Sequence, residues 1–294
     1  MVTCTGRSLA VACLVFFLAT SCDDGSDTGA PAAVRVRTSE APEVPRHRED
    51  WKTYPTQIDG RLALVLVDLG FGREPSIGSC PHLARVVVPL KDPGPEGVGS
   101  ASAEEALARL EDQLLGDLGP REEWRFVGRV RTAGEFRYYF YVADVAAFGA
   151  RVGEATRRRP DDRPRLEFEL DEGWRLYRSD LYPSEEREEW ISDMEVVETL
   201  RSQGDPLVDP RPVTHWLYFA TGEDRARFRR SIEGRGFAVA GEEDGISMER
   251  PFQLVLERVG SVDLERIHAE VMELVEAARA CGGEYDGWET QVKK

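Results

Sequence analysis

The carboxylates near the end of the chain are the side chains that come nearest to a site for chemistry. Asp286 and Glu289 flank Trp288. Paired carboxylates are what glycoside hydrolysis uses, with one carboxyl as the acid and the other as the base or nucleophile. Glu284, Asp286 and Glu289 also fit an exposed acidic edge that meets a basic protein partner. We favour exposed carboxylates that bind a partner and catalyse nothing.

The other residues of this segment fit a structural role. Gly282 and Gly283 stand where a helix would end, and glycine is the usual residue at such a C-terminal cap. Gly287 follows an aspartate, a pair typical of a bulge or tight turn. Tyr285 and Trp288 would then pack on a sheet. We therefore expect the glycines and aromatic residues of this motif to be structural.

Motifs for metal or cofactor chemistry are missing from the sequence. The four histidines are scattered, and neither His-Glu-x-x-His nor Cys-x-x-Cys occurs. The glycine-rich stretch 94–99 lacks the Gly-Lys-Ser/Thr of a phosphate loop. We expect no metal, no cofactor and no enzyme. The alternative is a hydrolase of the cell envelope whose dispersed carboxylates form no motif.

The first 22 residues predict export. Arg7 precedes an apolar run from Leu9 to Ala19. Eleven helical residues span about 16 Å, too short for a bilayer core of about 30 Å. The pattern is typical of a secretory signal. Residues Leu18 to Cys22 (LATSC) resemble the bacterial lipoprotein lipobox. We expect cleavage after residue 21, lipidation of Cys22 and anchoring in the cell envelope on the exported side of a membrane. An ordinary signal peptide with a free cysteine is the alternative.

Residues 22–49 contain no aromatic side chain and are interrupted by prolines, which predicts a flexible tether. Beyond it only Cys80 and Cys281 remain of the five cysteines. A disulfide between them is permitted in an oxidising compartment. Two buried free thiols are the alternative that we favour.

The overall charge constrains the partner. Lys and Arg total 38 against 54 Asp and Glu, a net charge of −16. Such a surface repels phosphate backbones, so we expect no nucleic acid. Basic proteins suit it better. The hydrophobic share of 41% in 294 residues is enough for one large domain or two ordinary ones.

Periodicity predicts two α+β domains, at residues 50–183 and 213–294, joined by an acidic helix and a proline-rich linker at 184–212. The second domain has strand patterns at 215–220, 237–240, 252–259 and 284–292, and helix patterns at 223–233 and 263–281. The order strand, helix, strand, strand, helix, strand is the ferredoxin-like, split βαβ order. The first domain repeats most of it. We expect two tandem ferredoxin-like sandwiches with antiparallel sheets.

The C-terminal motif also supports a family resemblance. Residues Gly282 to Thr290 (GGEYDGWET) resemble the terminal motif of the RraB family, regulators that inhibit ribonuclease E. The pattern before it, over roughly 214–292, is similar as well. The resemblance implies a ferredoxin-like fold and an acidic protein that binds another protein. An exported lipoprotein does not meet a cytoplasmic ribonuclease, so we expect a different partner. A cytoplasmic ribonuclease E regulator is the alternative if residues 1–21 are not a signal.

The N-terminal domain resembles a bacterial domain of unknown function that is often fused ahead of the RraB module. The similarity rests on Trp51 to Pro55 (WKTYP) and Gly173 to Tyr177 (GWRLY). No activity is implied by it.

Overall fold

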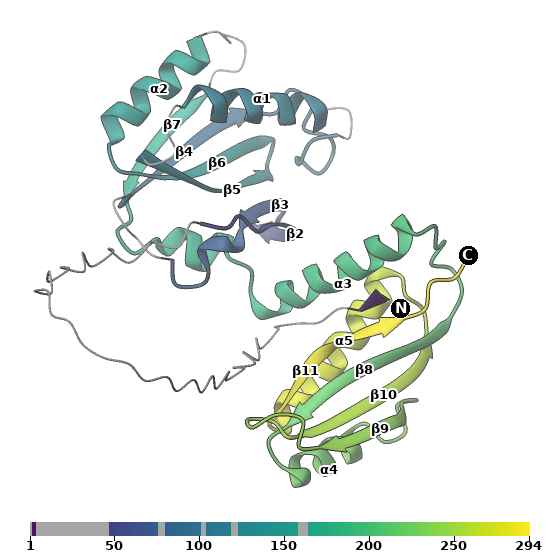
Figure 1. Ribbon diagram of the computed structural model, residues 1–294. Helices are drawn as coiled ribbons and strands as arrows, with labels where there is room; N and C mark the ends of the chain where they lie inside the picture. The colour runs from purple at the N-terminus through teal and green to yellow at the C-terminus, as the bar shows by residue number, and fades with distance from the viewer. Residues whose placement is uncertain (1, 4–46, 76–79, 101–103, 119–122, 158–163) are drawn as a thin grey trace, which may run out of the picture.

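The computed structural model describes residues 2–3, 47–75, 80–100, 104–118, 123–157 and 164–294. Cys22 and nearly all of the expected signal and tether lie outside these residues. The chain is α+β, with two antiparallel sheets and helices packed against them (Figure 1). The described part of the chain has no helix that is both long enough and apolar enough to cross a membrane.

The N-terminal domain is built on a six-stranded antiparallel sheet of order β2-β3-β5-β6-β4-β7. Helices α1 and α2 lie on one face of this sheet (Figure 1). The bounds of these elements are β2 Trp51–Ile58, β3 Arg61–Asp68, β4 His82–Pro89, α1 Glu104–Asp117, β5 Trp124–Thr132, β6 Glu135–Val142, α2 Val145–Arg157 and β7 Arg165–Leu170.

Both faces of this sheet are buried, as the alternation in β6 predicts. Phe136, Phe140 and their neighbours on one face pack under α1 and α2. Tyr139 and Tyr141 on the other face belong to a second core, covered by the segment from Trp174 onward. Tyr141 stacks on Trp174 with ring centroids 4.1 Å apart. Cys80 and Cys281 are buried free thiols, as we favoured.

Strand β2 has no clear strand pattern in the sequence because its composition is mixed and includes a proline. It pairs with β3 as a hairpin with a two-residue loop, Asp59–Gly60, in which both residues have positive φ (52° and 72°). Asp-Gly is the preferred pair for this turn and was the signal that could have revealed the hairpin.

The C-terminal domain has four strands in the order β11-β8-β10-β9, all antiparallel. The predicted order of strands and helices is the order observed. A two-residue strand, β1 (Val2–Thr3), pairs with the outer edge of β11 at Thr290 and Glu289. The bounds of the other elements are β8 Arg211–Phe219, α4 Gly222–Ser231, β9 Ala238–Asp244, β10 Phe252–Gly260, α5 Leu264–Ala280 and β11 Gly283–Thr290.

Helix α3 (Glu185–Ser202), which we expected to connect the domains, packs mainly on the C-terminal one. Its Val196, Val197 and Leu200 are buried in the C-terminal core. Near its start, Ile191 joins the N-terminal core instead. Helix α3 therefore contributes to both cores.

The proline-rich segment after α3 is fixed to β8 by a buried ion pair. The Asp205 carboxylate accepts both guanidinium arms of Arg211, with Nη2 at 2.9 Å from Oδ1, and also the backbone N–H of Lys293 at 2.8 Å. Both side chains are at most 1% exposed. The hydrogen bonds from Arg211 hold the pKa of Asp205 well below its usual range.

These contacts predict that α3 is required for a stable C-terminal domain. A fragment of residues 184–294 should unfold cooperatively in urea. A fragment of 213–294 should unfold at a much lower urea midpoint, since each lost aliphatic side chain contributes about 1.5–3 kcal/mol. Circular dichroism would measure both midpoints. Equal midpoints would show that the packing of α3 adds nothing.

Candidate protein-binding site

The connection from α5 into β11 needs glycine at two successive positions. Gly282, just after the helix, has φ of +72°, a conformation that favours glycine. At Gly283 a Cβ atom would lie 2.3 Å from the ring of Phe219. This close approach sets β11 directly against β8.

A β-bulge in the middle of β11 explains the rest of the motif. Tyr285 lies opposite Leu217 and Gly287 opposite Trp216, so Asp286 is the extra residue. Tyr285 and Trp288 are three residues apart and would face opposite sides of a regular strand. The extra residue brings both into the core between sheet and helices.

Trp288 is fully buried and is fixed by a carboxylate from α3. Its indole Nε1 donates to Asp193 Oδ1 at 2.8 Å. The other oxygen of Asp193 lies 2.8 Å from His268 Nδ1 on α5. Burial raises the pKa of Asp193, although the hydrogen bonds from His268 and Trp288 oppose this. Asp193 therefore links α3, α5 and β11.

A second buried chain of polar groups begins at Tyr285. Its hydroxyl lies 2.9 Å from His215 Nδ1, and His215 Nε2 lies 2.9 Å from Glu270 Oε1. Arg258 pairs with the other oxygen of Glu270 at 2.6 Å. Burial tends to raise the pKa of Glu270, but hydrogen bonds from His215 and Arg258 bring it below its usual range. Two of the scattered histidines, His215 and His268, are thus paired with carboxylates distant in sequence, which no local pattern indicated.

A groove of about 570 Å³ lies between α3 and the first half of β11, with residues of the N-terminal domain such as Lys52 and Tyr182 at its wall. Most of its charged lining is acidic. The carboxylates are Glu185, Glu188, Glu189, Asp193, Glu195, Glu284 and Asp286, and the cations are Lys52, Arg250 and Arg279.

Each cation of the groove is already paired. Lys52 binds Glu195 at 2.6 Å, Arg279 binds Glu185 at 2.8 Å and Arg250 binds Glu284 at 2.8 Å. Among the described residues, no ion-pair partner is found for Glu189 or Asp286. The groove therefore has surplus negative charge.

Burial, together with neighbouring negative charge, raises the pKa of both of these carboxyls. Burial, with the charges of Asp193 and Glu188, raises the pKa of Glu189 to about 7. Burial and the neighbouring Glu284 raise the pKa of Asp286 to about 6. The causes are separate for the two groups, so they do not form a coupled catalytic pair.

The structure thus separates the residues proposed for partner binding. Glu284 and Asp286 line the groove, whereas Glu289 lies farther along β11 beside Thr3 and outside it. Asp286 and Glu289 do not share a cavity, as a carboxylate pair of a hydrolase would. The acidic residues of α3 are the part of this site that the sequence analysis did not include.

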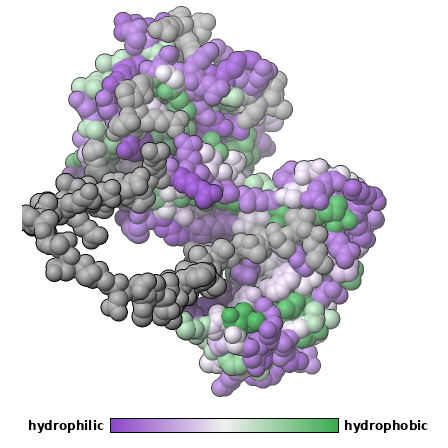
Figure 2. Space-filling view, in the orientation of Figure 1, coloured by the Kyte–Doolittle hydropathy of each residue, from purple (hydrophilic) through white to green (hydrophobic). Residues whose placement is uncertain are grey.

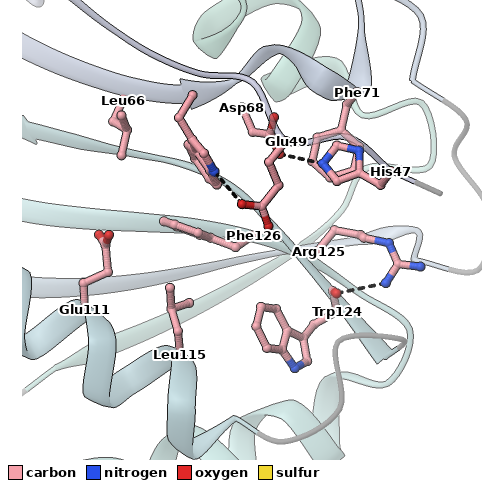
Figure 3. Close-up of a pocket in the computed structure, with 11 residues that line it drawn as sticks. His47, Glu49, Leu66, Asp68, Phe71, Glu111, Leu115, Trp124, Arg125 and Phe126 are labelled. Atoms are coloured by element: carbon pink, nitrogen blue, oxygen red, sulfur yellow. Dashed lines mark hydrogen bonds and ion pairs between the residues drawn. The ribbon is translucent and has the colours of Figure 1, made fainter.

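A second cavity, of about 490 Å³, lies in the N-terminal domain and is lined by residues of α1 and of strands β2, β3 and β5 (Figure 3). Its lining includes Trp51, Trp124 and Phe126. His47 stacks on Phe71 with centroids 3.9 Å apart and hydrogen-bonds Asp68 at 2.6 Å. The described residues contain no group of three His, Cys, Asp or Glu arranged to hold a metal.

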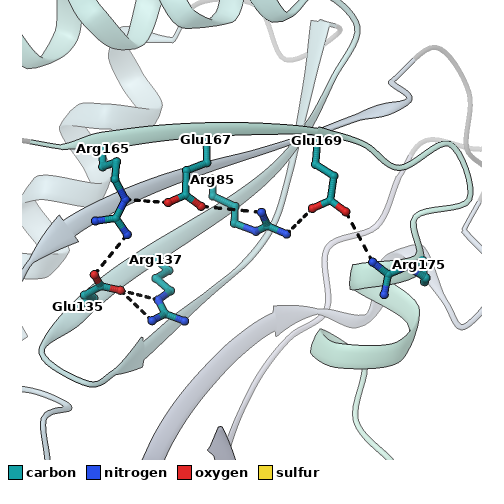
Figure 4. Close-up of polar contacts among 7 residues, drawn as sticks. All are labelled: Arg85, Glu135, Arg137, Arg165, Glu167, Glu169 and Arg175. Atoms are coloured by element: carbon teal, nitrogen blue, oxygen red, sulfur yellow. Dashed lines mark hydrogen bonds and ion pairs between the residues drawn. The ribbon is translucent and has the colours of Figure 1, made fainter. Parts of the chain in front are cut away.

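Strands β6, β4 and β7, neighbours in the N-terminal sheet, carry a ladder of opposite charges (Figure 4). Arg85 of β4 binds Glu169 of β7 at 2.8 Å, and Arg137 binds Glu135 within β6 at 2.8 Å. These charges largely compensate one another, in contrast to those of the groove. Figure 2 shows hydrophilic residues over much of the visible surface of both domains.

Trp288→Ala should destabilise the C-terminal domain by about 3–5 kcal/mol, because a large buried ring is lost. It also leaves Asp193 without its indole donor. Urea unfolding would measure the change, with Trp216→Ala on β8, a partly exposed indole of the same sheet, as control. A fully stable Trp288→Ala protein would contradict the structural role of this ring.

The raised pKa of Asp286 predicts that the stability of the folded protein depends on pH. Its pKa of about 6 in the folded protein lies above the ordinary 3.8, so folding favours the protonated form. The free energy of unfolding gained from the protonated carboxyl is complete below about pH 4 and is lost as the pH rises through about 6. Asp286→Asn should therefore gain stability over the wild type between pH 4 and 7. A stability difference that is constant with pH would show that burial does not act on this carboxyl.

Comparison with known proteins follows the division into two domains. Residues 190–290 match the model of the RraB family, described as regulator of ribonuclease activity B. Residues 49–182 match a family of unknown function (DUF695). Among curated proteins, no match was found.

A crystal structure of an unknown protein from Galdieria sulphuraria is similar at 8% identity, over 72% of this chain and 99% of that one, with a TM-score of 0.19. This low score supports no argument about the fold or function. The family resemblance stated from the sequence is confirmed by the two models: the chain joins a domain of the unknown-function type to a C-terminal domain that matches the RraB family.

Proposed function

We propose that this protein is an exported lipoprotein, anchored through Cys22, that regulates another protein by binding it and catalyses no reaction. The match of residues 190–290 to a family of regulators supports a regulatory or protein-binding role. The acidic groove between α3 and β11 is the observation that carries the proposal for this chain, because its unpaired carboxylates suit a basic partner.

The binding surface comprises Glu189 of α3 together with Glu284 and Asp286 of β11. Burial and, to a smaller extent, neighbouring carboxylates raise the pKa of Glu189 and Asp286, and a basic partner would lower it again. Cationic side chains in the groove would hold both carboxyls ionised. Binding of the partner should therefore release protons near neutral pH.

Cytoplasmic regulation of a ribonuclease is the second candidate function, favoured by the description of the matching family. Location separates the two candidates. A chain processed at Cys22 is outside the cytoplasm and meets envelope proteins, whereas an unprocessed chain would meet the ribonuclease.

One experiment tests both location and binding. The wild type, Cys22→Ala and the groove variant Glu284→Gln/Asp286→Asn are expressed in a bacterial host with a fatty-acid label. Wild type should carry label and sediment with membranes, and Cys22→Ala should lose both properties. Proteins cross-linked to the wild type should be captured less by the groove variant, since the charges that speed encounter are gone.

A matched control variant loses the same number of negative charges at positions outside the groove. Glu243→Gln/Glu249→Gln removes two exposed carboxylates of the same domain outside the groove. It should capture partners as the wild type does. Equal capture by wild type and groove variant would refute the groove as the binding surface. An unlabelled, soluble wild type would refute the lipid anchor and favour the cytoplasmic role.

A further inference from the structure

The outer edge of β11 is open along most of its length. Its inner edge pairs with β8 from Gly283 to Thr290. On the outer edge, the only described strand is β1, which reaches Thr290 and Glu289. Over residues 283–288, no described strand pairs with this edge. Such an edge presents unpaired backbone N–H and C=O groups that can pair with another strand.

Helices α5 and α3 pack on one face of this sheet, and this helical layer extends beyond the β11 edge. Helix α3 packs beside α5, and Asp193 fixes it to Trp288 of the edge strand. Part of α3 therefore lies beyond the edge of β11, and β1 contacts it there (Figure 1). A strand added to β11 would rest on α3 as the other strands rest on α5.

In the unprocessed chain β1 pairs antiparallel with the end of this edge, and the proposed cleavage after residue 21 would remove β1 and open the edge there as well. The remaining open stretch of six residues borders the acidic groove, which Gly283, Tyr285 and Gly287 help to line. At about 3.4 Å per residue, it would accommodate about 20 Å of extended chain. Alternate side chains of such a segment would point toward α3, where Glu185, Glu188 and Glu189 lie.

We propose that the partner binds by adding an extended basic segment as an antiparallel strand to the outer edge of β11, between Gly283 and Trp288 and over α3. The inference rests on the proposed binding function and specifies its mode. Backbone hydrogen bonds to β11 supply pairing, as in other cases of strand addition. Lys or Arg side chains at alternate positions meet the carboxylates of the groove, which gives the preference for a basic sequence.

The test uses the full chain in detergent micelles and a ten-residue peptide of alternating Lys and Val with blocked ends. Hydrogen exchange with mass spectrometry follows the backbone amides of each strand. The peptide should slow exchange in β11 about tenfold or more, since new interstrand hydrogen bonds protect the outward amides. The same peptide with every backbone nitrogen methylated keeps its charge, but it has no N–H to donate and its methyl groups keep its carbonyls from approaching the edge, so it should give no protection.

Two variants then separate the contributions of charge and backbone. Glu284→Gln/Asp286→Asn should weaken peptide binding about 2- to 10-fold, as expected for partly exposed charges. The control Glu243→Gln/Glu249→Gln should leave it unchanged. The same loss in both variants would mean that overall charge, not the groove, attracts the peptide.

The outcomes distinguish the mode of binding from the binding function. If the N-methylated peptide binds as well as its parent, and the groove variant weakens both, the acidic groove stands and strand addition is wrong. Protection at β9, the opposite edge of the sheet, would also overturn the proposed site. No binding of either peptide at about 1 mM would refute both proposals.

Discussion

The hydrogen bond between the Trp288 indole and the buried Asp193 carboxylate is the interaction on which the candidate site depends. It connects the last strand of the sheet to a helix that precedes the whole domain in sequence. A buried carboxylate is costly unless its oxygens are bound. Asp193 meets this requirement only where Trp288 and His268 are both within reach. The position of α3 is thus specified by polar contacts as well as by its aliphatic side chains.

The bulge at Asp286 has two consequences that belong together. It turns Tyr285 and Trp288 to the same face, so that each reaches its buried polar partner. It also leaves Asp286 as the unpaired extra residue, beside the groove. One inserted residue therefore fixes the core and places a carboxylate at the surface where binding is proposed. The glycine that follows allows this geometry, with φ of 135°.

The two sheets share a pattern of connections. In the C-terminal domain the strands in chain order β8, β9, β10 and β11 form the sheet order β9-β10-β8-β11. In the N-terminal domain β4, β5, β6 and β7 form the corresponding order β5-β6-β4-β7. The β2–β3 hairpin extends the N-terminal sheet beyond β5. In the C-terminal domain the corresponding strand β9 is an edge strand instead, and α3 lies beside the opposite edge strand, β11.

Much of the secondary structure was determined by the sequence alone. The spacing of apolar residues located α5 and β10, because period 3.6 or 2 reflects burial on one face. Gly282 and Gly283 indicated where the last helix ends and the last strand begins. The family resemblance, carried by Gly282 to Thr290, came from the same segment. The apolar residues of β2 do not alternate regularly with polar ones, so the sequence pattern does not identify this strand.

Only the tertiary structure decided which charged and polar side chains contact one another. Asp193 and Trp288 are 95 residues apart, and His215 and Glu270 are 55 apart. The sequence of α3 predicts a connecting helix packed against one domain, and only the structure shows that its buried face joins the C-terminal core. The acidic groove exists because that packing sets the carboxylates of α3 opposite those of β11. Local periodicity reports which side of an element is buried but not which other element covers it, so the site could not be assembled from the sequence.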